Sequence, residues 1–287
     1  MNQNLRRAAK TLVFKLPYGP KLAYLPGRFR LGWSYCAPQF ARLLVWLLRS
    51  NERQNFTYAI TSRNEADIAH TLAVALDADP AILLAYMQEP KTDEALKRHI
   101  ASAIAASPRR HEADMRVEFG RRLGWYAATR QKKPRLVIET GIDKGLGAVL
   151  LCAALARNAA EGHPGRYLGT DNNPIAGYLL SGSYRNFGEI LYGDSIESLR
   201  GLSETVDIFI NDSDHSAIYE YDEYQTIARL LDPRAVILGD NAHSSDSLRR
   251  FAQESARRFL FVREEPLDHW YPGAGIGIAF ASRPMRG

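Results

Sequence analysis

The chain has 287 residues, 46% of them hydrophobic and 24% charged, which is typical of a folded globular protein with a sizeable core. Its net charge of +5 originates in residues 1–51, which contain nine Lys or Arg and no Asp or Glu. Of the 37 bases, 28 remain for the rest of the chain, against 32 acids. The charge therefore gives little support to nucleic-acid binding by the whole protein.

The cysteine count and the hydropathy pattern set further limits. Cys36 and Cys152 are far apart and have neither disulfide-framework nor zinc-motif spacing, so we expect a reduced, cytoplasmic protein. The most apolar run, LLVWLL at 43–48, is far shorter than the roughly 20 residues that a membrane span needs. The first residues also lack the apolar core and cleavage site of a signal peptide.

Residues 1–133 are expected to form a mostly helical cap or dimerisation region, within a homo-oligomer. The stretch 17–33 is rich in Pro, Gly and Tyr, which predicts no regular element there. Residues 62–79 and 92–107 have helical patterns. The basic arm in residues 1–51 could lie on an anionic membrane, although a solvated or dimer-packing arm is the commoner role of a charged run.

The pattern changes at RQKKPR, residues 130–135, after which short β-branched runs alternate with helical segments. Five such alternations predict a Rossmann-like α/β domain over residues 134–287, with a mostly parallel sheet. The last two runs, joined by a turn-rich segment, predict an antiparallel hairpin at one edge. The seven predicted strands are residues 136–140, 166–170, 189–193, 206–211, 235–239, 259–262 and 275–281.

A glycine-rich turn follows the first strand, at the end of the sheet where ligands of open α/β folds bind. Glu139-Thr140-Gly141, continued by Gly145 and Gly147, allows a tight turn and close approach of a ligand to the backbone. The spacing is neither a phosphate-binding loop nor the dinucleotide fingerprint. The ligand therefore need not carry phosphates, and a purely structural turn is the alternative.

Carboxylates follow the second and third strands. Asp171, with Asn172 beside it, could accept both hydroxyls of a ribose, or it could make an Asx turn. Asp194-Ser195 could meet an adenine amino group, or it could cap the helix that follows. Each pair taken alone leaves both roles open.

These three motifs, in this order, resemble those of the class I S-adenosylmethionine-dependent methyltransferases over residues 134–287. The resemblance implies that the glycine turn and the acids after the next strands hold S-adenosylmethionine. The implied cofactor residues are Glu139, Thr140, Gly141, Gly145, Asp171, Asn172, Asp194, Ser195 and Asp212. Residues 1–133 have no counterpart in this resemblance.

Two further strand ends carry acids. Asp212 and Asp214 follow the fourth strand and would share a face in extended chain, and Asp240-Asn241 follow the fifth. Oxygen ligands without cysteine favour a hard cation such as Mg²⁺, which would lower the pKa of a bound substrate hydroxyl. The alternative is that the first two acids are turn residues and the second pair caps the following helix.

This set resembles the metal site of the cation-dependent O-methyltransferases of the catechol, caffeoyl-CoA and macrocin types. The resemblance implies Asp212, Asp240 and Asn241 as metal ligands, with Asp214 near the cofactor or substrate. His215 stands where the catechol-type enzymes place a lysine base, and histidine is itself a competent base.

The sequence therefore predicts an enzyme that moves a methyl group from S-adenosylmethionine to a hydroxyl of a small molecule held on a divalent metal. A metal-independent O- or N-methyltransferase with His215 as base is the first alternative. A nicotinamide-dependent oxidoreductase would need phosphate contacts that the glycine turn does not offer. An alternative that is not an enzyme is a binding module whose basic arm docks to a membrane or nucleic acid. The acceptor is left open.

Overall fold

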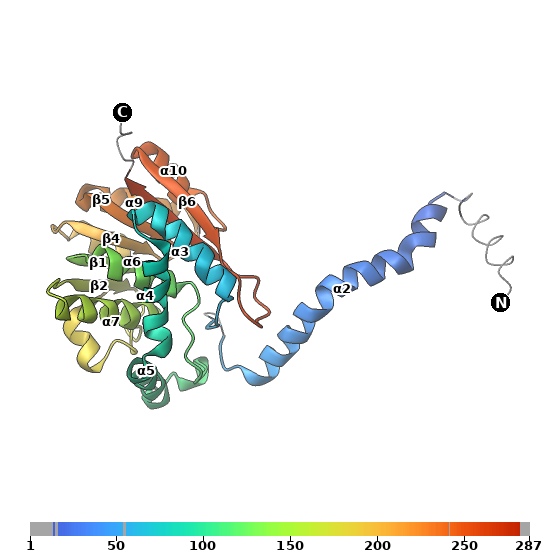
Figure 1. Ribbon diagram of the computed structural model, residues 1–287, viewed down its shortest axis with the longest axis horizontal. Coiled ribbons are helices and arrows are strands. Elements are labelled where there is room, and N and C mark those ends of the chain that lie inside the picture. The colour runs from blue at the N-terminus through green and yellow to red at the C-terminus, as the bar shows by residue number, and fades with distance from the viewer. Residues whose placement is uncertain (1–13, 15–16, 54–55, 241, 282–287) are drawn as a thin grey trace. The chain divides into compact units, whose positions relative to one another are not determined.

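The structure is a computed structural model that describes residues 14, 17–53, 56–240 and 242–281 (Figure 1). Its contacts divide the chain into two compact units. The first comprises Met1–Ser50 with Asp268–Trp270, and the second comprises Asn51–Leu267 with Tyr271–Gly287. Within the described ranges, no helix is both long and apolar enough to cross a membrane.

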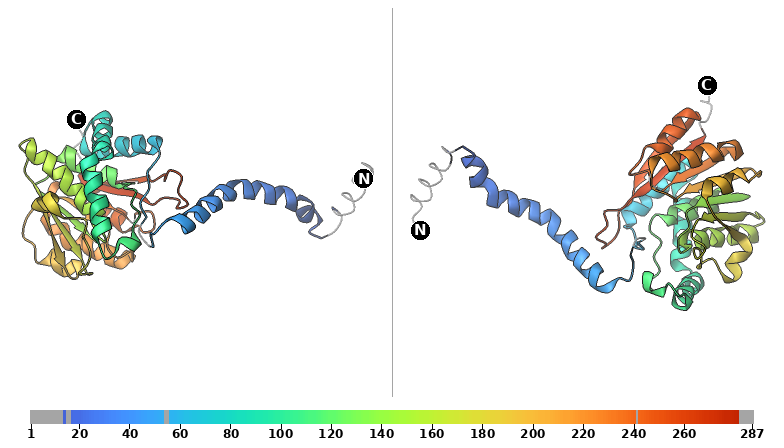
Figure 2. Two further views of the ribbon diagram at one scale, coloured as in Figure 1. Left: turned by 90° about the horizontal axis from the view of Figure 1, so that it is seen from below. Right: turned by 180° about the vertical axis from the view of Figure 1, so that it is seen from behind.

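The first unit consists mainly of one long helix, α2, over Gly19–Arg49, which Figure 2 shows as a curved rod. The prediction of no regular element over residues 17–33 is therefore wrong. Pro20 lies in the first turn, where a backbone N–H has no helical partner, so proline is tolerated there. Pro26 and Pro38 lie inside the helix, each with the loss of one backbone donor.

The second unit is built on a sheet that has seven strands in its described residues, in the order β3-β2-β1-β4-β5-β7-β6 (Figure 1). β1 to β5 are parallel, and β7 runs antiparallel between β5 and β6. The predicted α/β fold and its edge hairpin are confirmed. The strands are β1 Leu136–Thr140, β2 Arg166–Asp171, β3 Gly188–Tyr192, β4 Val206–Asn211, β5 Leu231–Gly239, β6 Arg257–Arg263 and β7 Gly275–Ala281.

Helices cover both faces of this sheet because successive strand side chains point to opposite faces. Ile208 and Ile210 pack with the helices that precede β2, whereas Phe209 packs with those that follow β3. On the first face lie α3 Ser62–Leu76, α4 Pro80–Thr92, α5 Glu94–Ala106, α6 Arg122–Lys132 and α7 Leu146–Ala160. On the second face lie α8 Ser195–Arg200, α9 Ala217–Ile227 and α10 Ser247–Glu254.

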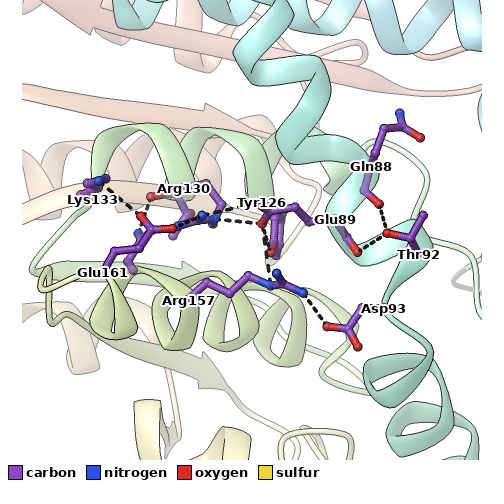
Figure 3. Close-up of polar contacts among 11 residues, drawn as sticks. Gln88, Glu89, Thr92, Asp93, Tyr126, Arg130, Lys133, Arg157 and Glu161 are labelled. Carbon is purple, nitrogen blue, oxygen red and sulfur yellow. Dashed lines mark hydrogen bonds and ion pairs between the residues drawn. The ribbon is translucent and has the colours of Figure 1, made fainter.

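A polar cluster joins α4, α6 and α7 (Figure 3). Arg130 donates to Glu89 at 2.9 Å and to Glu161 at 2.5 Å, and the Tyr126 hydroxyl donates to Glu89 at 2.6 Å. The Arg130 side chain is only 4% exposed, so these acids satisfy a charge that would be costly to bury alone. Helices before β1 thus share a unit with the sheet, and the boundary at residues 133/134 stays a prediction.

Candidate functional site

A cavity of about 510 Å³ lies at the carboxyl ends of β1 to β4, where the sequence predicts the cofactor site. Ile100 and Ile104 of α5 also line it, together with residues between 113 and 118, so segments before β1 help to build the site. The predicted residues that line the cavity are Gly141, Asp171, Asn172, Asp194, Ser195, Asp212, Asp214 and His215. Glu139, Thr140 and Gly145 are not among its lining residues.

Close backbone contacts require glycine in the turn after β1. Gly141 has φ 77°, and a Cβ atom there would lie 2.1 Å from the carbonyl oxygen of Asp212. Its N–H donates to the carbonyl of Thr170 at 2.9 Å, and the Asp212 N–H donates to that of Thr140 at 2.9 Å. Gly145 has φ 91° at the start of α7. Three strand ends are thereby held around the cavity mouth.

Glu139 lies behind this turn, fully enclosed by protein. Its carboxylate accepts the Tyr167 hydroxyl at 2.6 Å. Gly147 leaves space for it, because a Cβ there would lie 2.2 Å from its Oε1 atom. Burial raises the pKa of Glu139 to about 7. The structure therefore gives Glu139 a place in packing the turn, and its predicted cofactor role stays a prediction.

Asp171 fixes the turn from the end of β2. Its Oδ2 atom accepts the N–H groups of Ile142 at 3.1 Å and Asp143 at 2.9 Å. Its Oδ1 atom accepts the N–H of Asn173 at 2.8 Å, which is the predicted Asx turn. Because each carboxylate oxygen has two lone pairs, Asp171 retains acceptor capacity toward the cavity that it lines.

Asp194 and Ser195 both line the cavity and both have structural bonds. Asp194 caps α8 by accepting the N–H of Glu197 at 2.9 Å, and this bond leads the causes that lower its pKa. The Ser195 hydroxyl donates to Glu223, which also accepts Ser213 at 2.6 Å. Glu223 on α9 thus joins the ends of β3 and β4.

A second cavity of about 310 Å³ shares Phe56, Arg122, Asp212 and His215 with the first. Its other lining residues add one acid, one arginine, two aromatic rings and a histidine: Tyr58, Arg121, Asp240, His243, Ser244, Tyr271 and Ala274. The ring of Tyr271 lies 5.6 Å from Phe56 and 6.0 Å from Tyr58, measured between centroids. This cavity is therefore charged on one side and aromatic on another.

The two strand-end acids come together as predicted, because β4 and β5 are neighbours and the Asp240 N–H donates to the Asn211 carbonyl at 2.9 Å. Two arginines at the start of α6 contact them. Arg121 forms a two-bond pair with Asp240, one of the bonds at 2.5 Å from Nη2 to Oδ2. Arg122 lies 3.5 Å from the Asp212 carboxylate.

The pKa values of Asp212 and Asp240 are shifted in opposite directions. Burial, and then the charge of Asp240, raises the pKa of Asp212 well above its usual value. Burial would do the same to Asp240, but the Arg121 guanidinium holds the pKa of Asp240 below its usual value. Arg121 also lies 3.4 Å from Glu264. Of the two acids, Asp212 is therefore the more readily protonated.

Asp214 lies beyond β4, which ends at Asn211. Its predicted place near the cofactor or substrate stays a prediction. Its carboxylate is exposed and accepts the Ser216 N–H at 2.6 Å, which leads the causes that lower its pKa. It is a turn residue before α9 that also lines the larger cavity. His215 beside it is exposed and lines both cavities.

The donor set does not fit a metal as it stands. Both oxygens of Asp240 face Arg121, and Asp212 faces Arg122. Across the described residues, no group of three or more His, Cys, Asp or Glu could hold a metal ion. Asn241, the third predicted ligand, lies outside the described residues. The cations that these carboxylates require are present as guanidinium groups.

Sequence reasoning did not find Arg121, Arg122 or Glu223. The arginines lie about 90 to 120 positions before the acids they meet, which no local motif reveals. Glu223 had a weak signal, since it lies one turn into a helix that directly follows a strand end. Its neighbours in sequence are also acidic or aromatic, so the signal did not single it out.

The sheet order, with a cavity beyond the carboxyl ends of its parallel strands, is the arrangement that the sequence predicts. Residues 138–242 match a family model that is described as a methyltransferase domain. This match identifies a methyltransferase domain within the chain. A search of the curated proteins finds no match.

Several solved structures are similar in fold. An O-methyltransferase from Bacillus cereus in complex with SAH is 15% identical, has a TM-score of 0.46, and matches over 69% of this chain and 97% of that one. An SAH-bound methyltransferase from Podospora anserina is 15% identical and has a TM-score of 0.48; it matches over 69% of this chain and 93% of that one. An O-methyltransferase from Streptomyces achromogenes in complex with SAM is 18% identical and has a TM-score of 0.46; it matches over 67% of this chain and 91% of that one.

Proposed function

We propose that the protein transfers the methyl group of S-adenosylmethionine to a hydroxyl group of a small molecule, with His215 as base and no metal ion. The observation that carries this proposal is the pair of cavities with four shared lining residues. A cofactor in the larger cavity and an acceptor in the smaller one would meet at those residues. Such alignment of the reacting groups supplies much of the rate of a transfer reaction.

S-adenosylmethionine, when bound, supplies a methyl group that leaves its sulfur as a C–O bond forms to the acceptor. Asp171 and Asp194 line the cofactor cavity with carboxylates that suit hydroxyl and amino groups. His215 lines both cavities and takes the proton that the acceptor hydroxyl loses. Asp212 lies at the same junction, paired with Arg122.

The smaller cavity favours a flat acceptor. Phe56, Tyr58 and Tyr271 bring three rings to its lining, and aromatic walls suit a ring that carries the reacting hydroxyl. Arg121 and Arg122 line this cavity as well, and their guanidinium groups can donate hydrogen bonds to oxygen substituents on that ring. A phenol with a neighbouring oxygen substituent is the simplest molecule with both features.

The metal-dependent reaction that the sequence predicts is the competing outcome, and one experiment separates the two. Calorimetric titration with S-adenosylhomocysteine should show binding in Mg²⁺ and in EDTA alike. Asp171→Ala should weaken this binding about tenfold or more, because a charged acceptor is lost. Methyl transfer to a panel of phenols should then be unchanged by EDTA and lost in His215→Ala. A Mg²⁺ requirement would restore the metal-dependent reaction, and absence of nucleoside binding would refute the assignment of the cavity.

A further inference from the structure

The helix α2 has an exposed apolar stripe. Its members recur three, four or seven positions apart, and at 3.6 residues per turn they fall on one side of the helix. They are between 44% and 68% exposed, although each is a large hydrophobic residue. The stripe consists of Leu22, Leu25, Phe29, Trp33, Phe40, Leu44 and Leu47.

The opposite side of α2 carries most of its bases. Lys21, Arg28, Arg42 and Arg49 fall away from the stripe, Arg30 lies near its border, and the helix contains no acidic residue. The same side also exposes Tyr24, Leu31 and Tyr35. The 18 residues before the helix add four more bases in sequence and no acid. A pairing partner for Arg42 is Asp268, at 3.5 Å within the same unit. The remaining charge on this side is therefore uniformly positive.

We infer that α2 binds the surface of an anionic lipid bilayer, with the apolar stripe inserted at the boundary between headgroups and acyl chains. An amphipathic helix with bases on one side and Trp, Phe and Leu on the other is the form that lies in that interface. Aromatic rings such as Trp33 are also favoured at this depth. The positive side then faces anionic headgroups, each base strengthening binding by about fivefold.

The charge decides between this surface and a second copy of the chain. Pairing two copies of α2 through their stripes would place two helices with five bases each side by side, and neither helix contains an acid to offset that positive charge. An anionic bilayer supplies the missing negative charge. The methyltransferase site lies in the other unit, so this inference does not depend on the function proposed for that site.

Flotation of the full chain with vesicles tests the inference. Binding is expected to phosphatidylcholine vesicles that contain phosphatidylglycerol, to be much weaker with phosphatidylcholine alone, and to fall with salt. Phe29→Ser with Phe40→Ser should lower binding by about tenfold or more, because two inserted rings are lost. Tyr24→Ser with Tyr35→Ser is the matched control, since it removes two rings from the basic side and should leave binding largely unchanged.

Charge variants and a folding control complete the test. Lys21→Gln with Arg28→Gln should lower binding by roughly 25-fold, from about fivefold for each base. Each variant should keep the circular dichroism spectrum and the thermal unfolding midpoint of the parent, which shows that the fold is intact. Equal vesicle binding by the stripe variant and its control would overturn the inference. So would a stripe variant that converts a dimer into a monomer when the parent chain binds no vesicles, because the stripe would then belong to a second copy.

Discussion

Replacing Glu139 with Gln is expected to stabilise the protein at high pH and to leave its stability unchanged at low pH. The carboxyl of Glu139 is buried, and burial raises its pKa from 4.5 to about 7. The folded state therefore keeps a proton that the unfolded chain releases between these two values. Stability is fully present below pH 4.5 and is lost as pH rises toward 7, because the unfolded state is then favoured by proton release.

The size of the effect follows from the difference between the two pKa values. A difference of about 2.5 units corresponds to roughly 3 kcal/mol in the free energy of unfolding. Glutamine keeps the shape of the side chain and an oxygen that can accept the Tyr167 hydroxyl, now 2.6 Å from the carboxylate. The variant should therefore be similar to the parent at about pH 4 and more stable by roughly 3 kcal/mol at about pH 8.

Urea unfolding of both proteins at about pH 4, pH 6 and pH 8 measures this difference directly. The comparison between the two proteins removes the titration of other buried acids, such as Glu223, because both proteins contain them. A stability difference that stays constant across the three pH values would refute the reasoning. It would mean that Glu139 ionises as it does in the unfolded chain.

Three substitutions test the packing around the site. Gly141→Ala should lower the free energy of unfolding by about 3 kcal/mol or more, because the residue has φ 77° and no room for a Cβ. In the same thermal unfolding assay, the control Gly201→Ala should change this free energy by less than about 1 kcal/mol. Arg121→Met should destabilise the protein by roughly 3–5 kcal/mol in urea, since Asp240 loses its buried partner. Arg130→Met should do the same by about 3 kcal/mol, and an unchanged midpoint in either case would show that the pair is not formed.

The sheet could be predicted from the sequence because its strands are short apolar runs between polar turns. Each of the runs that the sequence marks as a strand overlaps one in the structure, from Leu136–Thr140 to Gly275–Ala281. The prediction for α2 failed for a local reason. Pro and Gly are common in turns, but Pro20 occupies the first helical turn and the apolar stripe repeats at helical spacing across Pro26 and Pro38.

The meeting of Asp212 with Asp240 could be predicted, because both follow strands that were expected to be neighbours. The place of Asp214 could not, because it depends on where the chain stops being extended after β4. The two arginines could not be found either. They reach the acids only through the packing of α6 against the sheet, and that tertiary contact leaves no periodic or motif signal.

The identity of the cation at this edge of the sheet has consequences for catalysis. The sequence shows that paired carboxylates there need positive charge, but a divalent ion and two guanidinium groups meet that need equally well. Arg121 and Arg122 already face Asp240, Glu264 and Asp212, and burial raises the pKa of Asp212. A divalent ion would add positive charge to carboxylates that already have cationic partners. A guanidinium group cannot give up its proton in a protein, so it cannot act as a base. In the reaction that we propose, the base is therefore a side chain at the junction of the two cavities, which His215 lines.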